Sequence, residues 1–328
     1  MKILIIGGGP AGATAARLLA KAHDVTLIQE RIWEKPCGGG TKTHIFEELQ
    51  LDKKLIRHLL DKVYMIYKNE KIEIPLKGKN LAIIKREDFD SHLRDLAQKE
   101  GAKLIYGKFK RFENKKAVVY TNKEKISFEY DILIAADGVN STVRKAINLP
   151  PVPKTITHYA KTDKYKVKTC EFFFDFELGG EYYAWAFPHT DKTHIGSVDK
   201  NSFENLCSYL GVNVKPKGYF IPTWEENVII QKENIYFVGD AAAQVMPLSF
   251  EGIYYAIKSA QILAKSINHN LNYEEEWKKA YLKKFKFMKF LERVNKTKLR
   301  GFIVKAHKIK KVRDFSVSLW LNEQKINI

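Results

Sequence analysis

The sequence predicts an α/β protein with a mainly parallel sheet, an inserted and mostly antiparallel sheet, and a helical C-terminal tail. Apolar runs alternate with helical stretches up to residue 150, which is typical of parallel strands covered by helices. Residues 151–230 are rich in aromatic and β-branched residues and contain several turn signals. A strand-like run at 235–238 and a helix after Gly252 then return to the first pattern, so we expect the first domain to be discontinuous.

The first thirty residues have the pattern of a βαβ unit. An apolar run at Lys2–Ile6 is followed by a glycine turn, an Ala-rich helical stretch and a second apolar run. Gly7 permits the tight turn, Gly9 lets the backbone approach a pyrophosphate, and Gly12 lets helix and strand pack closely. Glu30 follows Gly12 by 18 residues, where a carboxylate accepts ribose hydroxyls. The unit therefore predicts a nucleotide cofactor.

Composition excludes several classes of protein. The chain of 328 residues contains no apolar run of about 18 residues and no signal-peptide pattern, so we expect a cytoplasmic protein without membrane spans. The three cysteines, Cys37, Cys170 and Cys207, are far apart, which matches neither a disulfide framework nor a metal site. We therefore expect no metal.

The chain is strongly basic, with 56 Lys and Arg against 38 Asp and Glu and a net charge of +18. Residues 273–328 alone contain 16 basic and 6 acidic residues. No nucleic-acid-binding motif accompanies this charge, so no nucleic-acid partner is expected. The surplus indicates either a lysine-rich solvated surface or peripheral contact with an anionic membrane, here the inner face of the cytoplasmic membrane.

The first part of the tail has helical periodicity. Its apolar stripe comprises Tyr281, Phe285, Met288 and Leu291, while Lys279, Lys283 and Lys286 lie largely on another side. Such a stripe packs on the protein's own core or rests on an anionic membrane, and the sequence leaves both open.

Two further strand-to-turn motifs follow the first. In DILIAADGVNSTVR, at Asp131–Arg144, an apolar strand delivers Asp137 and Gly138 at its carboxyl end, before a helix start. In NIYFVGDAAAQVMPLSFEGI, at Asn234–Ile253, a strand ends in Gly239 and Asp240, and Pro247 precedes a long helix. Asp240 is placed to hold ribityl hydroxyls, and the helix N-terminus to face the pyrimidine edge of a flavin. Three such motifs in this order predict one extended cofactor.

These strings resemble the FAD-binding motifs of the flavoprotein superfamily that includes para-hydroxybenzoate hydroxylase and the geranylgeranyl reductases. KREDFDSHL, at Lys85–Leu93, is similar to that superfamily's R-x-x-F-D-x-x-L helix. The resemblance implies a Rossmann-like FAD-binding domain of the glutathione-reductase type. The FAD-binding residues that it implies are Gly7, Gly9, Pro10, Ala11, Gly12, Glu30, Arg31, Arg86, Asp137, Gly138, Gly239, Asp240, Pro247, Gly252 and Ile253.

The domain boundaries follow from these patterns. We expect a discontinuous FAD-binding domain, a substrate domain built on the inserted sheet, and a basic helical tail. Their ranges are 1–62, 86–150 and 231–270 for the first, 63–85 and 151–230 for the second, and 271–328 for the third.

Two strings are similar to motifs of the geranylgeranyl reductases in particular. KPCGGG, at Lys35–Gly40, follows the second strand, and YAWAFP, at Tyr183–Pro188, lies in the inserted sheet. Tyr183, Trp185 and Phe187 alternate, so they form either an aromatic wall for a long apolar ligand or an ordinary sheet core. Cys37 is either a weak proton donor or a small buried residue. We expect Cys37, Tyr183, Trp185 and Phe250 at the catalytic site.

Two positions depart from the family pattern. Gly180 stands where the family usually has a proline, three residues before the motif tyrosine. Phe250 replaces a glycine that is expected close to the flavin, so it narrows or reshapes substrate access.

The resemblance implies an FAD-dependent oxidoreductase that reduces carbon–carbon double bonds of an isoprenoid or quinone-like substrate. No second G-x-G-x-x-G motif occurs, so the electrons are expected from transiently bound NADPH or from an acidic carrier such as reduced ferredoxin. Two alternatives remain open: an FAD-dependent aromatic monooxygenase, and a membrane-associated interaction protein that binds FAD structurally.

Overall fold

A computed structural model describes the chain except for residues 33–34, 69, 79, 322–325 and 327–328. Its first layer is a six-stranded sheet with the order β18–β19–β12–β1–β2–β8, parallel except for the edge strand β18. The strands are β1 (Lys2–Ile6), β2 (Asp24–Gln29), β8 (Lys103–Tyr106), β12 (Ile132–Ala135), β18 (Gln231–Lys232) and β19 (Ile235–Phe237).

The central strands of this sheet form because they consist of short apolar runs that can be buried on both faces. In β1, residues 3–6 are all buried. Helix α1 (Pro10–Leu19) packs beside α3 (Arg86–Lys99) and α7 (Ile253–Asn268), and all three contribute to the core around the sheet. A separate three-stranded sheet, described below, contributes Phe109, Ala117 and Val119 to the same core. The predicted α/β fold with a mainly parallel first sheet is confirmed.

The second large sheet has seven strands in the order β17–β13–β16–β15–β14–β5–β6 and is antiparallel except for the pair β14 and β5. It combines two segments of the chain, 62–75 and 154–222. The strands are β5 (Lys62–Tyr67), β6 (Glu70–Pro75), β13 (Lys154–Thr162), β14 (Glu171–Phe173), β15 (Ala184–Pro188), β16 (Thr193–Ser197) and β17 (Lys217–Pro222).

Two three-stranded antiparallel sheets and several helices complete the structure before the C-terminal tail. One sheet comprises β9 (Lys108–Glu113), β10 (Lys116–Tyr120) and β11 (Lys125–Phe128), and the other β3 (Gly40–Lys42), β4 (Ile56–Leu60) and β7 (Leu81–Ile84). The helices are α2 (His44–Glu48), η1 (Lys53–Leu55), α4 (Thr142–Ala146), α5 (Phe176–Gly179), α6 (Lys200–Leu210) and η2 (Gly239–Ala242).

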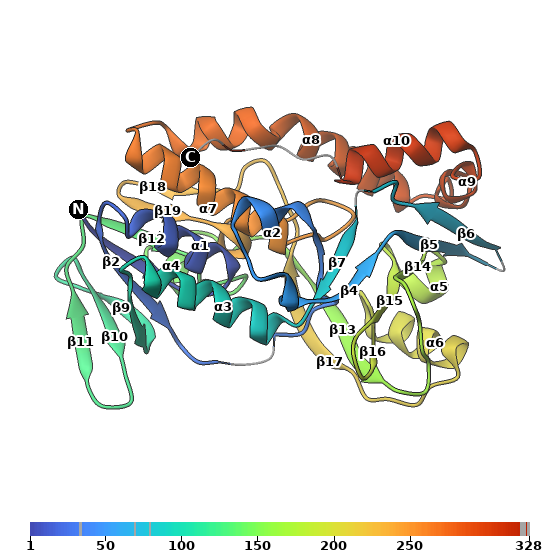
Figure 1. Cartoon of the computed structure of the whole chain (residues 1–328), viewed down its shortest axis with the longest axis horizontal. Helices are drawn as coiled ribbons and strands as arrows, with labels where there is room; N and C mark the ends of the chain where they lie inside the picture. The colour runs from blue at the N-terminus through green and yellow to red at the C-terminus, as the bar shows by residue number, and fades with distance from the viewer. Residues whose placement is uncertain (33–34, 69, 79, 322–325, 327–328) are drawn as a thin grey trace.

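The C-terminal tail is helical, as predicted, over its described residues. It forms α8 (Tyr273–Asn295), α9 (Arg300–Ala306) and α10 (Lys310–Leu321), which run along one side of the molecule (Figure 1). The rest of the predicted tail, residues 322–325 and 327–328, lies outside the described part. Within the described part, no helix is long and apolar enough to cross a bilayer.

The predicted apolar stripe of the tail packs on the protein's own core. Tyr281, Phe285 and Met288 are buried on α8, where the ring of Phe285 contacts those of Trp224 and Tyr255. In α10, Val317 and Leu321 are buried in a different cluster, together with residues of the strands β4–β7.

Candidate active site

A cavity of about 890 Å³ joins the carboxyl ends of β1, β2 and β12 to the seven-stranded sheet and to the tail helices. The structure brings most of the predicted site residues together in its wall. These are Gly7, Gly9, Pro10, Ala11, Glu30, Arg31, Cys37, Arg86, Asp137, Gly138, Tyr183, Trp185, Asp240, Phe250, Gly252 and Ile253. Gly12, Gly239 and Pro247 are not among the residues that line the cavity.

The first glycine turn leaves the N-terminus of α1 open to the cavity. Gly7 has a φ of +102°, and a Cβ there would lie 2.3 Å from the carbonyl oxygen of Ala136. A Cβ on Gly12 would lie 1.8 Å from the carbonyl oxygen of Gly7, so this glycine serves the packing of helix on strand. Gly9, by contrast, faces open space, and no acidic residue occupies the first turn of α1. The helix end is thus suited to an anionic group.

Asp137, at the end of β12, presents one carboxylate oxygen that the fold does not use. Its Oδ2 accepts hydrogen bonds from the backbone N–H groups of Thr142 and Val143, at 2.7 and 3.1 Å. Its Oδ1 is buried without a partner among the described residues. Burial raises the pKa of Asp137, against the lowering effect of these hydrogen bonds. A ligand hydroxyl in the cavity would satisfy the unpartnered oxygen.

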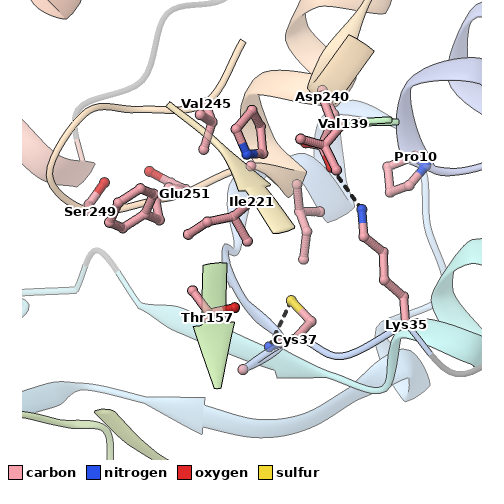
Figure 2. A pocket seen from close by; sticks show the side chains of 18 of the residues that line it. Pro10, Lys35, Cys37, Val139, Thr157, Ile221, Asp240, Val245, Ser249 and Glu251 are labelled. Atoms are coloured by element: carbon pink, nitrogen blue, oxygen red, sulfur yellow. Dashed lines mark hydrogen bonds and ion pairs between the residues drawn. The ribbon is translucent and has the colours of Figure 1, made fainter. Parts of the chain in front are cut away.

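Asp240 is held ionised by a lysine that the sequence analysis did not single out. The Nζ of Lys35 lies 2.8 Å from Oδ2 of Asp240, and Figure 2 shows the lysine side chain extending to this carboxylate. Burial raises the pKa of Asp240, but the charges of Lys35 and Arg86 outweigh this effect and hold the pKa below its usual range. Lys35 belongs to the KPCGGG string, but the sequence does not show that it pairs with Asp240.

Arg86 is anchored within the cavity wall beside Cys37. Its guanidinium donates to both carboxylate oxygens of Asp90, at 2.9 and 2.7 Å. Burial alone would lower the pKa of Arg86. Asp90 and the neighbouring Cys37 raise it by more than burial lowers it, so the pKa lies above its usual value. The Sγ of Cys37 accepts a hydrogen bond from the N–H of Gly39 at 3.3 Å, as drawn in Figure 2.

A pair of histidines supports the Cys37 loop, and the sequence analysis missed it. The rings of His189 and His194 stack with centroids 3.5 Å apart. His189 Nε2 donates to the carbonyl oxygen of Gly38 at 3.0 Å, and His194 Nδ1 lies 3.3 Å from that of Cys37. The hydroxyl of Tyr159, which lines the cavity, lies 2.9 Å from the same Nδ1. Burial lowers the pKa of His189 to about 4 and that of His194 to about 3.

The aromatic string forms one wall of the cavity. Tyr183, Trp185 and Phe187 all line it, together with Phe172. The ring centroid of Phe172 lies 5.5 Å from that of Tyr183 and 5.3 Å from that of Phe187. The hydroxyl of Tyr183 donates to the carbonyl oxygen of Ser249 at 2.7 Å, and burial raises the pKa of this phenol. The alternation of side chains along β15 therefore faces a cavity rather than a closed sheet core.

The tail supplies a further apolar part of the lining. The residues are Ile303, Val304, Val312, Val317, Leu319 and Trp320, from α9 and α10. They extend the cavity beyond the aromatic wall, away from the glycine turn, so it has the form of a long site with one polar and one apolar end.

Comparison with known families shows which family the chain belongs to. A family model described as an FAD binding domain matches residues 1–169, more than half of the chain. The chain belongs to this family. It is an FAD-dependent oxidoreductase that is similar to geranylgeranyl reductases. A relative is the chloroplastic geranylgeranyl diphosphate reductase of Nicotiana tabacum, which is 29% identical over 90% of this chain and 74% of the relative.

Solved structures agree on the fold of this flavoprotein. A geranylgeranyl bacteriochlorophyll reductase-like protein from Thermoplasma acidophilum has a TM-score of 0.74 at 20% identity and covers 97% of this chain and 98% of its own. The p-nitrophenol 4-monooxygenase of Pseudomonas putida has a TM-score of 0.79 at 14% identity, with 99% and 98% coverage. The shared architecture is therefore that of the para-hydroxybenzoate-hydroxylase type.

Gly180 and Phe250, the two departures from the family pattern, both have a positive φ. Gly180 has a φ of +56°, which the fixed ring of a proline cannot adopt. Phe250 also has a positive φ, of +52°, although it carries a side chain, and its ring packs 4.8 Å from that of Tyr182. Phe250 thus occupies cavity wall in a backbone conformation that favours glycine.

A buried ion pair lies beside Phe250 and was also missed from the sequence. The Oε2 of Glu251, which lines the cavity, is 3.5 Å from the Nζ of Lys42, and that ammonium sits 4.0 Å from the ring centroid of Tyr254. Burial raises the pKa of Glu251 against the opposing charge of Lys42. The two residues come from β3 and the turn before α7, so no local spacing relates them.

Proposed function

We propose that this flavoprotein reduces carbon–carbon double bonds of an isoprenoid or quinone-like apolar substrate. The observation that carries the proposal is the continuity of one cavity from the glycine turn at Gly9 to the aromatic wall at Trp185 and the tail lining at Trp320. The names of relatives such as the geranylgeranyl diphosphate reductase support the same substrate class.

The residues at the polar end fit FAD. The open N-terminus of α1 at Gly9 would hold the pyrophosphate, and Glu30, at the end of β2, the adenosine ribose. The unpartnered Oδ1 of Asp137 and the carboxylate of Asp240 would accept hydrogen bonds from hydroxyl groups of the cofactor. The N-terminus of the 16-residue helix α7, at Ile253, would face the flavin ring.

When bound and reduced by the electron donor, the flavin would supply hydride to the alkene. The chain's own residues would position the alkene and exclude water. Tyr183 and Trp185 would hold the prenyl chain against the aromatic wall, which is rigid because Tyr183 is bonded to the backbone at Ser249. The second hydrogen arrives as a proton, and the cavity offers the phenol of Tyr183 and the thiol of Cys37 as donors.

The electron donor is a separate part of the proposal. We propose NADPH, bound transiently, or an acidic carrier such as reduced ferredoxin. The net charge of +18 supports the second, because a positive surface speeds encounter with an acidic protein.

The test combines cofactor and product analysis. The purified protein should yield one FAD per chain on extraction, and the reduced protein should convert geranylgeranyl diphosphate under anaerobic conditions to a product heavier by two hydrogens per double bond. Tyr183→Phe and Cys37→Ser variants then separate the two proton donors, because only loss of the true donor slows reduction while FAD stays bound.

Other outcomes would contradict the proposal. Oxygen-dependent formation of a hydroxylated aromatic, with no alkene reduction, would favour the monooxygenase that the shared fold also accommodates. Bound FAD that neither NADPH nor ferredoxin reduces would favour a structural role for the cofactor.

A further inference from the structure

We infer that the outer face of α9 and α10 docks on the surface of an anionic lipid bilayer and brings the apolar end of the cavity to the membrane. The inference rests on the proposed function for the identity of the substrate, but the docking itself is argued from the surface alone. The α9–α10 face is defined here by its exposed residues. These are Lys298, Leu299, Phe302, Lys305, Lys308, Ile309, Lys310, Lys311 and Phe315.

Large apolar side chains project from this face into solvent. Phe302 is 74% exposed, and Phe315, Leu299 and Ile309 are 59–60% exposed. Phe302 has the highest exposed fraction among the large hydrophobic residues that the structure describes as exposed. These four side chains lie within seventeen residues of the chain, and groups of exposed apolar side chains mark surfaces that bind a protein or a membrane.

The same face carries an excess of basic charge. Residues 298–321 contain seven basic residues and one acid; the five lysines among them are exposed, whereas Arg300 is buried. Lys305 and Lys308 share a single carboxylate, that of Glu70. On α8, by contrast, lysines are matched by carboxylates of the chain, as in the pairs of Lys279 with Glu276 and Lys286 with Glu226. The uncompensated charge thus lies beside the exposed apolar residues, not along the buried stripe of α8.

The inner side of the same two helices lines the cavity. Ile303 and Val304 face it from α9, and Val317 and Trp320 from α10. Phe315 both lines the cavity and is exposed, so it lies at the rim. A single helical layer therefore separates the apolar end of the cavity from the basic outer face. A substrate that partitions into a bilayer would have the shortest route into the cavity at this layer.

The chemistry of the face favours a bilayer over other partners. Lysines that flank aromatic and aliphatic side chains on a helix suit the interface of an anionic membrane, where the charges meet headgroups and the apolar groups enter the acyl boundary. A nucleic acid or an acidic protein would use the lysines but gain little from Phe302 and Ile309. Binding that depends on both the lysines and the apolar side chains therefore indicates a membrane.

The experiment is co-sedimentation of the FAD-loaded protein with vesicles of phosphatidylcholine, with or without about one third phosphatidylglycerol. We expect binding only to the anionic vesicles, with strong weakening at about 0.5 M salt, where the screening length is about 4–5 Å. Lys310→Glu with Lys311→Glu should reduce the partition coefficient at least 25-fold, from about fivefold per lysine. Acidic residues at the start of α10 suit the helix dipole, so this variant should fold.

The apolar contribution has its own variant and controls. Phe302→Ser with Ile309→Ser should weaken binding about tenfold or more. Leu59→Ser, at an equally exposed residue on β4, and Lys110→Glu with Lys123→Glu, near the β10–β11 end of the molecule, should leave binding unchanged. Equal sedimentation with neutral vesicles, or none with either, would overturn the inference. So would binding that depends on the lysines alone, which would indicate an acidic macromolecular partner.

Activity measurements separate this inference from the proposed function. The Phe302→Ser, Ile309→Ser protein should reduce a detergent-dispersed prenyl substrate as fast as the unmodified protein, because neither residue lines the cavity, but it should lose turnover of substrate embedded in anionic vesicles. Vesicle binding without reduction of any prenyl substrate would refute the proposed function and leave the docking surface in place.

Discussion

The Nζ of Lys35 lies 2.8 Å from Oδ2 of Asp240, although 205 positions separate the two residues in the chain. The pair joins the loop that carries Cys37 to the turn after β19, where we propose that FAD is held. Figure 2 shows both residues at the cavity wall. The charge of one buried carboxylate therefore fixes the position of the loop that closes this side of the site.

Removal of the lysine should make stability depend on pH in a defined direction. In the native protein the pKa of Asp240 is lowered, so the pair stabilises the fold above the ordinary carboxyl pKa and the gain is lost as pH falls through the lowered value. In Lys35→Ala, burial is less opposed and the carboxylate is destabilising at pH 7. We expect a loss of about 1 kcal/mol, discounted because Lys35 is 36% exposed, and a smaller loss near pH 4.

Urea unfolding of the apoprotein at the two pH values measures this difference. Lys35→Arg is the matched control, since it keeps the cation and should retain most of the stability. An equal loss at pH 4 and pH 7 would show that Lys35 does not act through the carboxylate of Asp240.

The stacked histidines predict a second pH effect. The pKa of His194 is lowered by burial to about 3, below its ordinary value, so the unfolded chain binds protons that the native chain does not. The stabilising contribution is complete above the unfolded pKa near 6.5 and declines as pH falls toward 3. Between pH 7 and pH 5 the decline should be about 2 kcal/mol for this imidazole.

His194→Gln should remove that part of the pH dependence, measured as the change in unfolding free energy between pH 7 and pH 5. Tyr159→Phe is the control, because it deletes the hydroxyl at 2.9 Å but keeps the imidazole. It should lower stability at both pH values and leave the slope unchanged. An unaltered slope in His194→Gln would mean that this histidine is not held neutral.

The aromatic wall predicts a selective loss of activity. Trp185→Ala should keep FAD and lower kcat/KM for a long prenyl substrate by about 10- to 100-fold, because roughly 1–3 kcal/mol of apolar contact is lost. Tyr209→Ala, at an exposed ring on α6, should have no such effect. If Trp185→Ala unfolds or releases FAD, the wall is structural and the proposed substrate contact is wrong.

The fold was predictable where the signal was local. The strand at Lys2–Ile6 and the helix after Gly252 each follow from apolar runs, turns or glycine positions within a few residues. The parallel pairing of β14 with β5 was not, because it joins segments about 100 residues apart that carry no mark of their partnership.

The site divides in the same way. Asp137 and Asp240 are predictable because each follows an apolar strand within three residues, and the aromatic wall because its residues alternate. The Glu251–Lys42 pair and the His189–His194 stack were not, because tertiary packing creates them from separate elements. The sequence predicts a basic helix with one apolar stripe for the first part of the tail. In the structure that stripe is buried, and a different face, on α9 and α10, is exposed.

The last prediction concerns Phe250, whose φ of +52° is adopted more easily by glycine than by alanine. Phe250→Gly and Phe250→Ala both remove the ring that packs 4.8 Å from Tyr182. They differ only in backbone strain, so the glycine variant should be more stable by about 1 kcal/mol, the reverse of the usual order. Thermal unfolding measures the difference. Both variants should also reduce bulkier prenyl substrates faster, because the space beside the proposed flavin site widens. An alanine variant more stable than the glycine variant would contradict the strain argument, and substrate profiles identical to that of the unmodified protein would show that Phe250 does not shape access.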